Sequence, residues 1–228
     1  MSNINRAMIL AAGRGKRMRP LTDSCPKPLL PLAGKPLIEY HLNKLVSAGI
    51  SNIVINHAWL GEMIEEYFGN GEEFGCLINY SSEQEALETA GGIIKALPLL
   101  GDEPFIVVNG DIWSDCDYSQ LTDMDIKSGE AHLFLIENPD HNPNGDFIVD
   151  GDNRVQHKNG MDKSYTFSGI GIYSPEIFRG LQIAPLALIK IFNRLIPERR
   201  LNATIWNCRW CDVGTPERLK KLEAELLQ

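Results

Sequence analysis

The sequence lacks the features that mark several classes of protein. No stretch approaches the ~20 consecutive apolar residues that a membrane-spanning helix needs. The first residues do not combine a basic segment, an apolar run and a small-residue cleavage site, so they do not resemble a signal peptide. Internal repeats and low-complexity tracts are also missing. We therefore expect a cytoplasmic protein with no membrane partner.

Cysteine is scarce, and an odd number of scattered cysteines does not predict a disulfide framework. The five cysteines are Cys25, Cys76, Cys116, Cys208 and Cys211. The last two form a C-x-x-C, but a zinc site would need two further ligands, and none stands at a suitable spacing. A thioredoxin-like motif follows an early strand rather than lying near the end of a chain. We expect no joint metal or redox role for this pair.

Basic residues are outnumbered, with 22 Lys and Arg against 30 Asp and Glu, and the formal net charge is −8. This balance argues against a nucleic-acid partner, because such binding needs a basic face that neutralises phosphates. The charge is uneven, however, since residues 14–35 contain six basic residues and a single acid, Asp23. A local basic patch on an acidic protein suits a small polyanion such as a triphosphate.

Apolar runs alternate with amphipathic segments, which predicts an α/β fold with a mostly parallel sheet, helices around it and a mixed β extension. The length of 228 residues suits one domain over 1–228. The expected strands cover residues 7–10, 53–55, 77–80, 105–108, 131–136, 166–173 and 203–211, with a hairpin over 147–155. The expected helices cover residues 36–49, 60–68, 92–100, 186–195 and 215–227. Pro98 is expected to shorten the third helix.

A glycine-rich loop, Leu10–Thr22, follows the first expected strand. Gly13 and Gly15 remove side chains where a phosphate would approach the backbone, and the amides of such a loop can form an anion-binding nest. The loop is neither a Walker A motif nor a Rossmann G-x-G-x-x-G, since Met18 takes the place of the third glycine. Taken alone, it fits a tight structural turn with solvated Lys and Arg equally well.

Four further segments carry groups that suit phosphate and metal chemistry. Pro26-Lys27-Pro28 holds one cation in a rigid loop, Asn109-Gly-Asp111 and Trp210–Thr215 each place an Asp after a strand, and Leu87–Gly92 precedes a helix with small residues. Each segment has a plain structural alternative: a rigid loop with a surface Lys, two turns, and the start of a helix. The five histidines are scattered, and we expect all of them to be structural or solvated.

Together and in this order, these segments resemble the sugar-phosphate nucleotidyltransferases. The family pattern L-A-A-G-x-G-x-R-M-x-P-L-T…P-K-P-L is matched without a gap by Leu10–Leu29, and the L-x-T-A-G-G, N-G-D and D-V-G-T segments follow in order. The resemblance covers nearly the whole chain. It implies a Rossmann-like, three-layer α/β/α nucleotidyltransferase fold, with the nucleotide in the N-terminal half and the sugar in the C-terminal half. It also implies transfer of a nucleotide from an NTP to a sugar-1-phosphate, with release of pyrophosphate.

The resemblance implies a role for each matching position. Arg17 and Lys27 would be catalytic, and Asp111 and Asp212 would hold Mg²⁺. The residues implied to bind the nucleotide are Ala11, Ala12, Gly13, Gly15, Lys16, Arg17, Lys27, Glu83, Thr89 and Gly91, with Glu83 a partner for the base. The residues implied to bind the sugar are Asn109, Glu137, Gly145, Asp146, Ser168 and Gly169.

Several segments favour one branch of the family, which joins UTP to N-acetylmuramic acid α-1-phosphate in bacterial peptidoglycan recycling. They are residues 55–61, 87–92, 96–101, 109–113, 145–147 and 166–169. The alternatives are a mannose-1-phosphate guanylyltransferase, a glucose-1-phosphate thymidylyl- or uridylyltransferase, and a non-catalytic nucleotide-sensing subunit. The Glu-Lys-Pro common in the first two is replaced here by Glu137-Asn-Pro139. The oligomeric state cannot be read from the sequence, and a monomer is slightly favoured.

Overall fold

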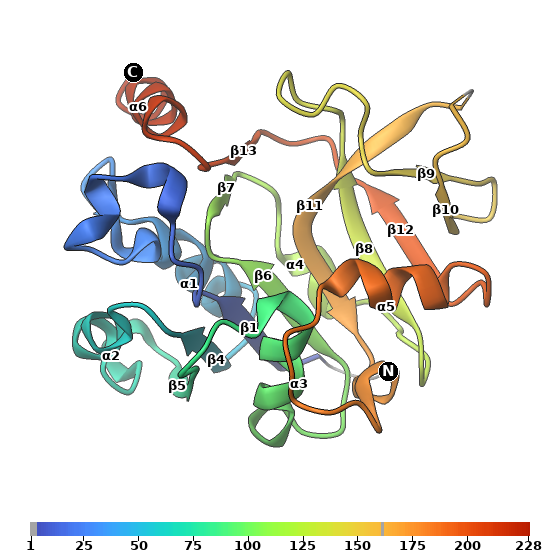
Figure 1. Ribbon diagram of the computed structural model, residues 1–228, viewed down its shortest axis with the longest axis horizontal. Coiled ribbons are helices and arrows are strands. Elements are labelled where there is room, and N and C mark those ends of the chain that lie inside the picture. Colours follow the sequence, from blue (N-terminus) through green and yellow to red (C-terminus); the bar gives the residue numbers. More distant parts are fainter. Residues whose placement is uncertain (1–3, 161) are drawn as a thin grey trace.

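A twisted mixed sheet lies between two layers of helices in the computed structural model, which describes residues 4–160 and 162–228 (Figure 1). Four parallel strands make up its N-terminal half, in the order β6-β1-β4-β5. Their bounds are β1 Arg6–Leu10, β4 Asn52–His57, β5 Leu77–Ser82 and β6 Phe105–Asn109. No helix in the described part of the chain is long and apolar enough to cross a membrane.

The C-terminal half of the sheet is mostly antiparallel and joins the first half through β11, Ser164–Tyr173, which pairs with β6. Its other strands are β8 Ala131–Ile136, β9 Phe147–Val149, β10 Val155–His157 and β12 Leu201–Ile205. β9 and β10 form the hairpin expected over 147–155, and β12 runs parallel to β8. The expected mixed sheet is therefore confirmed.

Each face of the sheet is covered by its own helices, as two separate apolar clusters show. Helices α1 Leu37–Ser47, α2 Gly61–Phe68 and α4 Ser119–Thr122 pack on one face. Helices α3 Glu88–Leu100 and α5 Leu188–Leu195 pack on the other. The last helix, α6 Pro216–Leu226, instead packs on the glycine-rich loop region, where Leu219 and Leu222 meet Met18 and Leu32. Two further small strands there are β2 Pro31–Leu32 and β3 Lys35–Pro36.

Three expectations about the elements are wrong. α3 begins at Glu88 rather than at residue 92, and it continues past Pro98 to Leu100 because a proline in the last turn removes only one helical hydrogen bond. The strand expected over 203–211 is divided into β12 and β13, Trp210–Asp212. The division follows Trp206, whose ring packs 4.2 Å from that of Phe134 between centroids. Two short elements were not predicted: β7, Ile112–Ser114, which pairs with β13, and α4.

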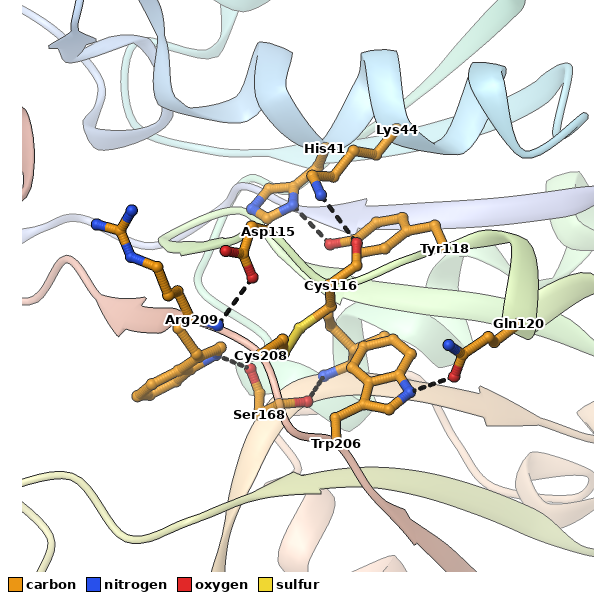
Figure 2. The surroundings of a disulfide bond; sticks show 12 residues. His41, Lys44, Asp115, Cys116, Tyr118, Gln120, Ser168, Trp206, Cys208 and Arg209 are labelled. Carbon is orange, nitrogen blue, oxygen red and sulfur yellow. Dashed lines mark hydrogen bonds between the residues drawn. A yellow bond between two sulfur atoms is a disulfide. The ribbon is translucent and has the colours of Figure 1, made fainter. Parts of the chain in front are cut away.

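A disulfide joins Cys116 to Cys208, which corrects the expectation that the cysteines form no such link (Figure 2). The antiparallel register of β7 and β13 pairs Ser114 with Trp210, so Cys116 and Cys208 lie opposite each other just beyond the ladder. Their Cα atoms are 5.2 Å apart although 92 residues separate them in the chain. Cys211 is a free thiol, so Cys208 is bonded to a cysteine outside the C-x-x-C.

His41 ties α1 to the segment that follows β6 (Figure 2). Its two ring nitrogens lie 2.7 Å from the Ile112 carbonyl oxygen and 2.8 Å from the Tyr118 hydroxyl. Burial lowers the pKa of His41 to about 4, and burial lowers that of His132 to about 4 as well. Both rings are therefore neutral parts of the core at neutral pH, in agreement with the structural role expected for the histidines.

We expect the free energy of unfolding to fall as the pH is lowered from about 6.5 to about 4. In that range the unfolded chain binds protons at both histidines and the folded chain does not. Each histidine therefore lowers the free energy of unfolding by about 1.4 kcal/mol for each pH unit of acidification. Urea unfolding at several pH values measures the slope. His132→Gln is expected to remove about half of the histidine contribution, whereas the exposed-residue control His157→Gln should retain it. An unchanged slope in His132→Gln would refute this account.

Candidate active site

Two neighbouring clefts open at the carboxyl ends of the parallel strands, the edge where α/β sheets bind ligands. The first cleft lies over β1, β4 and β6 and is lined by Leu10, Ala11, Ala12, Gly13, Lys27, Pro28, Asn56, Glu83, Ala86, Glu88, Thr89, Asn109 and Asp111. The second is lined by Arg17, Asn109, Asp111, Ile112, His141, Asn142, Thr166, Phe167, Ser168, Gly169, Trp210 and Asp212. Asn109 and Asp111 belong to both, so they mark the junction.

The glycine-rich loop is held in shape by contacts among its own residues. Gly15 has a φ of 65°, and a Cβ there would lie 3.0 Å from Thr22 and 3.1 Å from Lys27. Thr22 Oγ1 donates to the Gly15 carbonyl at 2.8 Å, and Arg14 donates to the Thr22 carbonyl at 2.8 Å. The Arg14 guanidinium also lies 3.9 Å from the centroid of the Trp59 ring. Glycine is therefore needed at position 15, and Arg14 is a structural residue.

Lys16 and Arg17 follow in a single 3₁₀ turn, Lys16–Met18, anchored by the fully buried Met18. Both side chains are exposed, and neither forms an ion pair within residues 4–160 and 162–228. Arg17 lies on the wall of the second cleft with Asp111 and Asp212. The turn thus presents cations at the edge of the clefts, which suits an anionic ligand.

Lys27 is the buried cation of the site. Its side chain is 8% exposed, and its Nζ lies 2.7 Å from Asp111 Oδ2. The lysine begins the 3₁₀ turn Lys27–Leu29 between Pro26 and Pro28, which fixes the backbone direction as expected. The structure therefore brings together the predicted catalytic lysine and one of the two predicted metal ligands.

Asp212 lies beside Asp111 because β13 pairs with β7. In that ladder Asp212 is opposite Ile112, and Val213 N donates to the Asp111 carbonyl at 3.0 Å. Asp212 Oδ2 accepts a hydrogen bond from Arg218 at 2.8 Å, and His141 Nε2 lies 3.7 Å from the same oxygen. Each aspartate therefore has one oxygen held by a cation of the protein.

The donor set fits a hard cation that takes most of its ligands from substrate and water. No group of three or more potential metal-ligating His, Cys, Asp or Glu side chains occurs in the described part of the chain. Asp111 and Asp212 offer only carboxylate oxygens, and Mg²⁺ is commonly held by one or two carboxylates together with phosphates and waters. A zinc-type site with several nitrogen or sulfur ligands does not match these residues.

A chain of buried polar groups forms the floor of the first cleft. Ala11 N donates to Asn56 Oδ1 at 2.9 Å, and Asn56 Nδ2 donates to Glu83 Oε1 at 2.7 Å. Glu83 Oε2 accepts from Leu87 N at 3.1 Å. Ala11 and Glu83 were predicted from the sequence and Asn56 was not, although a polar residue at the end of the apolar strand 53–55 was a usable signal.

Two predicted nucleotide-binding residues at the start of α3 have different surroundings. Thr89 lines the first cleft. Gly91 does not line it: its N–H donates to the Leu186 carbonyl at 3.2 Å, and a Cβ there would lie 2.3 Å from the Ala184 carbonyl oxygen. Gly91 thus allows α3 to pack against the segment before α5, and a nucleotide-binding role for it stays a prediction.

A bulge in β11 forms the wall of the second cleft. The register between β11 and β8 shifts between Phe167 and Ile170, so Ser168 and Gly169 leave the ladder. Gly169 has a φ of 81°, and a Cβ there would lie 2.7 Å from Asn109 Nδ2. Bulges of this kind often redirect residues at active sites. The bulge places Gly169 against Asn109, and both residues line the second cleft together with Ser168.

Gly145 and Asp146 lie behind this wall and support it. Asp146 Oδ2 accepts from Phe167 N at 2.8 Å, and its Oδ1 accepts from Asn142 at 3.1 Å. Gly145 has a φ of 56°, and a Cβ there would lie 2.5 Å from Asn138. Neither residue lines the cleft, so the structure gives both a positioning role beside it.

Glu137 lies outside both clefts. Its side chain is 63% exposed and pairs with Lys163 Nζ at 2.7 Å on the surface. Six residues that line the second cleft were not among the predicted site residues: Ile112, His141, Asn142, Thr166, Phe167 and Trp210. Trp210 donates from Nε1 to the Ser168 carbonyl at 2.8 Å, and only the tertiary contact between β13 and β11 reveals this.

We expect Gly169→Ala to destabilise the protein by about 1–3 kcal/mol, because alanine is strained at positive φ and its Cβ would press on Asn109. The matched control is Gly151→Ala, since a Cβ at Gly151 meets nothing within 4 Å. Urea unfolding of both variants checks the difference. Equal stability of the two variants would mean that the bulge tolerates a side chain.

The chain was compared with known proteins. A family model described as "Nucleotidyl transferase" matches residues 6–228. The chain is 50% identical over 224 residues to the N-acetylmuramate alpha-1-phosphate uridylyltransferase of Neisseria meningitidis serogroup B, covering 96% of this chain and 97% of the relative. It is 33% identical to a protein of the same name from Caulobacter vibrioides, covering 97% of each chain.

The fold also matches a solved structure. A Bacillus anthracis crystal structure, provisionally assigned as a glucose-1-phosphate thymidylyltransferase and in complex with sucrose, superposes with a TM-score of 0.83 at 26% identity. The match covers 96% of this chain and 94% of that chain.

Proposed function

The chain belongs to the nucleotidyl transferase family, and we propose that it transfers the uridylyl group of UTP to N-acetylmuramic acid α-1-phosphate. The products would be UDP-N-acetylmuramic acid and pyrophosphate. The choice of substrates is supported by 50% identity, over nearly the whole length of both chains, to a uridylyltransferase named for this reaction. We also propose that residues 1–228 act as one cytoplasmic domain in bacterial peptidoglycan recycling.

The observation that carries the proposal is the cluster of Lys27, Asp111 and Asp212 where the two clefts meet. A nucleotide in the first cleft and a sugar phosphate in the second would bring their phosphates together at this cluster. The attacking sugar phosphate is already an anion, so the reaction needs no strong general base. Its barrier lies in bringing anions together in line, and fixed cations lower that barrier.

The basic residues at the two clefts fall into a buried group and an exposed group. Lys27 is buried and fixed, so we assign it to the α-phosphate and the incoming sugar phosphate, which must be held in one orientation. Lys16 and Arg17 are exposed on the loop, so we assign them to the outer phosphates, with Arg17 stabilising the charge on the departing pyrophosphate. Gly13 and Gly15 keep the loop backbone open to the triphosphate.

Asp111 and Asp212 would hold Mg²⁺, and the metal when bound would neutralise charge on the phosphate oxygens. The fit is supported by two features of the residues themselves. Asp111 lies just before β7 and Asp212 at the end of its partner strand β13, and each carboxylate already has an oxygen occupied by a cation, Lys27 or Arg218. The site is therefore built to place positive charge at these two oxygens.

The remaining predicted residues divide between the two clefts. We assign Ala11, Ala12, Glu83 and Thr89 to the base and ribose, since all four line the first cleft. Asn109, Ser168 and Gly169 would contact the sugar, with Gly145 and Asp146 holding that wall in place. Glu137 would need a rearrangement to reach the sugar, because it pairs with Lys163 at the surface.

A substrate panel tests the proposal directly. UTP, GTP, dTTP and ATP are each combined with the 1-phosphates of N-acetylmuramic acid, N-acetylglucosamine, mannose and glucose, and pyrophosphate release is measured with Mg²⁺ present. We expect the highest kcat/KM for UTP with N-acetylmuramic acid 1-phosphate. A preference for GTP with mannose 1-phosphate would overturn it in favour of the guanylyltransferase alternative. UTP binding without turnover of any sugar would favour a nucleotide-sensing subunit.

We expect Lys27→Ala to lower kcat by about 100-fold or more while UTP still binds, because removal of one preorganised cation costs roughly that much in comparable sites. Steady-state kinetics and UTP binding by calorimetry check the two halves of this prediction. The matched control is Lys35→Ala, which removes the same charge from a half-exposed side chain in the same basic segment. Full turnover by Lys27→Ala would remove this lysine from the mechanism.

A further inference from the structure

A third pocket adjoins the second cleft and has no role in the proposed chemistry. We call it the α6 pocket, because α6 forms one wall and the loop after β8 forms another. Its lining residues are Trp113, Pro139, Asp140, His141, Arg209, Trp210, Cys211, Arg218, Lys221, Leu222 and Glu225. It shares His141 and Trp210 with the second cleft, and their rings stack at 6.2 Å between centroids.

Three cations from two elements meet in this pocket. Arg209 comes from the segment before β13, and Arg218 and Lys221 lie one turn apart on α6. Arg218 is paired with Asp212 at 2.8 Å, and Arg209 with Glu225 at 3.1 Å. Lys221 forms no ion pair within residues 4–160 and 162–228.

The pocket also contains a hydrogen-bond donor without an acceptor. Trp113 is 6% exposed, and its Nε1 has no hydrogen-bond partner in the described part of the chain. Such buried donors are rare in folded proteins, because an unmade hydrogen bond is costly. The Arg209 guanidinium lies 5.5 Å from the centroid of the same indole ring. The indole ring of Trp113 lines the pocket beside three cations, and such a set of cations suits an anionic oxygen ligand.

We propose that the α6 pocket binds a carboxylate carried by the sugar phosphate and so selects that sugar. The proposal rests on the proposed function, since N-acetylmuramic acid differs from N-acetylglucosamine by a lactyl ether that ends in a carboxylate. The second cleft, where the sugar would bind, shares His141 and Trp210 with this pocket, so a sugar substituent can reach the pocket past these two rings. Arginine pairs well with carboxylates because its planar fork can donate two parallel hydrogen bonds.

The ion pair of Glu225 with Arg209 shows that the cations of this pocket can hold a carboxylate. The Glu225 carboxylate is already held by Arg209 from across the pocket wall, and both side chains are about half exposed. An exposed ion pair of this kind is weak, so a substrate carboxylate can replace it at little cost. Glu225 therefore acts as an internal competitor for the position that we assign to the lactyl carboxylate.

The test compares two sugar phosphates that differ only in the lactyl group. With UTP, the double variant Arg209→Gln/Lys221→Gln is expected to raise KM for N-acetylmuramic acid 1-phosphate by roughly 10-fold or more, as expected for lost charge-assisted contacts. Its kcat should stay within about twofold, and so should kcat/KM for N-acetylglucosamine 1-phosphate. Calorimetric Kd values of the two UDP-sugars give the same comparison independently of turnover.

The matched control is Arg179→Gln/Lys220→Gln, which removes the same two charges outside the pocket. Arg179 pairs with Glu176 on the surface, and Lys220 is the neighbour of Lys221 on α6. Neither lines the α6 pocket. We expect this control to leave KM for both sugar phosphates unchanged.

The variant Glu225→Gln is expected to change KM in the opposite direction to the double variant. The change frees Arg209 without altering the size of the side chain, so we expect KM for N-acetylmuramic acid 1-phosphate to fall and that for N-acetylglucosamine 1-phosphate to stay the same. A merely structural role for the Arg209–Glu225 pair would make both variants less active with both sugars.

The outcomes separate this inference from the proposed function. If the wild type does not prefer N-acetylmuramic acid 1-phosphate over the sugar that lacks the carboxylate, the proposed function fails. If the wild type has that preference and the double variant keeps it, the α6 pocket is not the selecting site. An equal loss of kcat/KM with both sugars, together with altered inhibition by free sulfate, would mean that the pocket binds a separate anion. That result would also overturn the inference.

Discussion

The short antiparallel pairing of β7 with β13 is the contact on which the rest of the site depends. It joins a segment that follows the central strand β6 to one that follows the outer strand β12, and it places Asp212 beside Asp111. A two-stranded ribbon of this length is not stable by itself. Its surroundings supply the missing stability: the disulfide closes one end (Figure 2), and the Nε2–H of His41 donates to the Ile112 carbonyl. The carboxylates are therefore held by the tertiary structure and not by the ribbon alone.

The residues that local sequence can specify were predicted well. The loop from Leu10, Lys27 between its prolines, and an Asp after a buried strand all depend on neighbours in the chain, and the structure brings them to one edge of the sheet. The errors arise where distant segments decide the outcome. Residues 203–211 were predicted as one strand because nothing in their sequence shows that Trp206 packs on Phe134, where β12 ends.

The same distinction explains the missed site residues and the surroundings of Gly91. The carbonyl oxygen of Ala184 lies close to where a Cβ at position 91 would be, so tertiary packing requires glycine there. His141 and Trp210 lie in unremarkable local sequence and become neighbours only when the loop after β8 meets β13. Pocket walls built from two such segments cannot be predicted from either one.

The two ion pairs at the aspartates have a thermodynamic consequence. Lys27 holds Asp111 at 2.7 Å and Arg218 holds Asp212 at 2.8 Å, so neither carboxylate is left without a counterion when no ligand is bound. Each aspartate keeps its other carboxylate oxygen outside the ion pair, so a divalent cation bound there would add its charge to that of Lys27 and Arg218. Phosphate would then meet more positive charge at the junction of the clefts than the protein alone supplies. Metal and phosphate affinities would be linked through this shared charge, and by reciprocity each ligand would tighten the binding of the other.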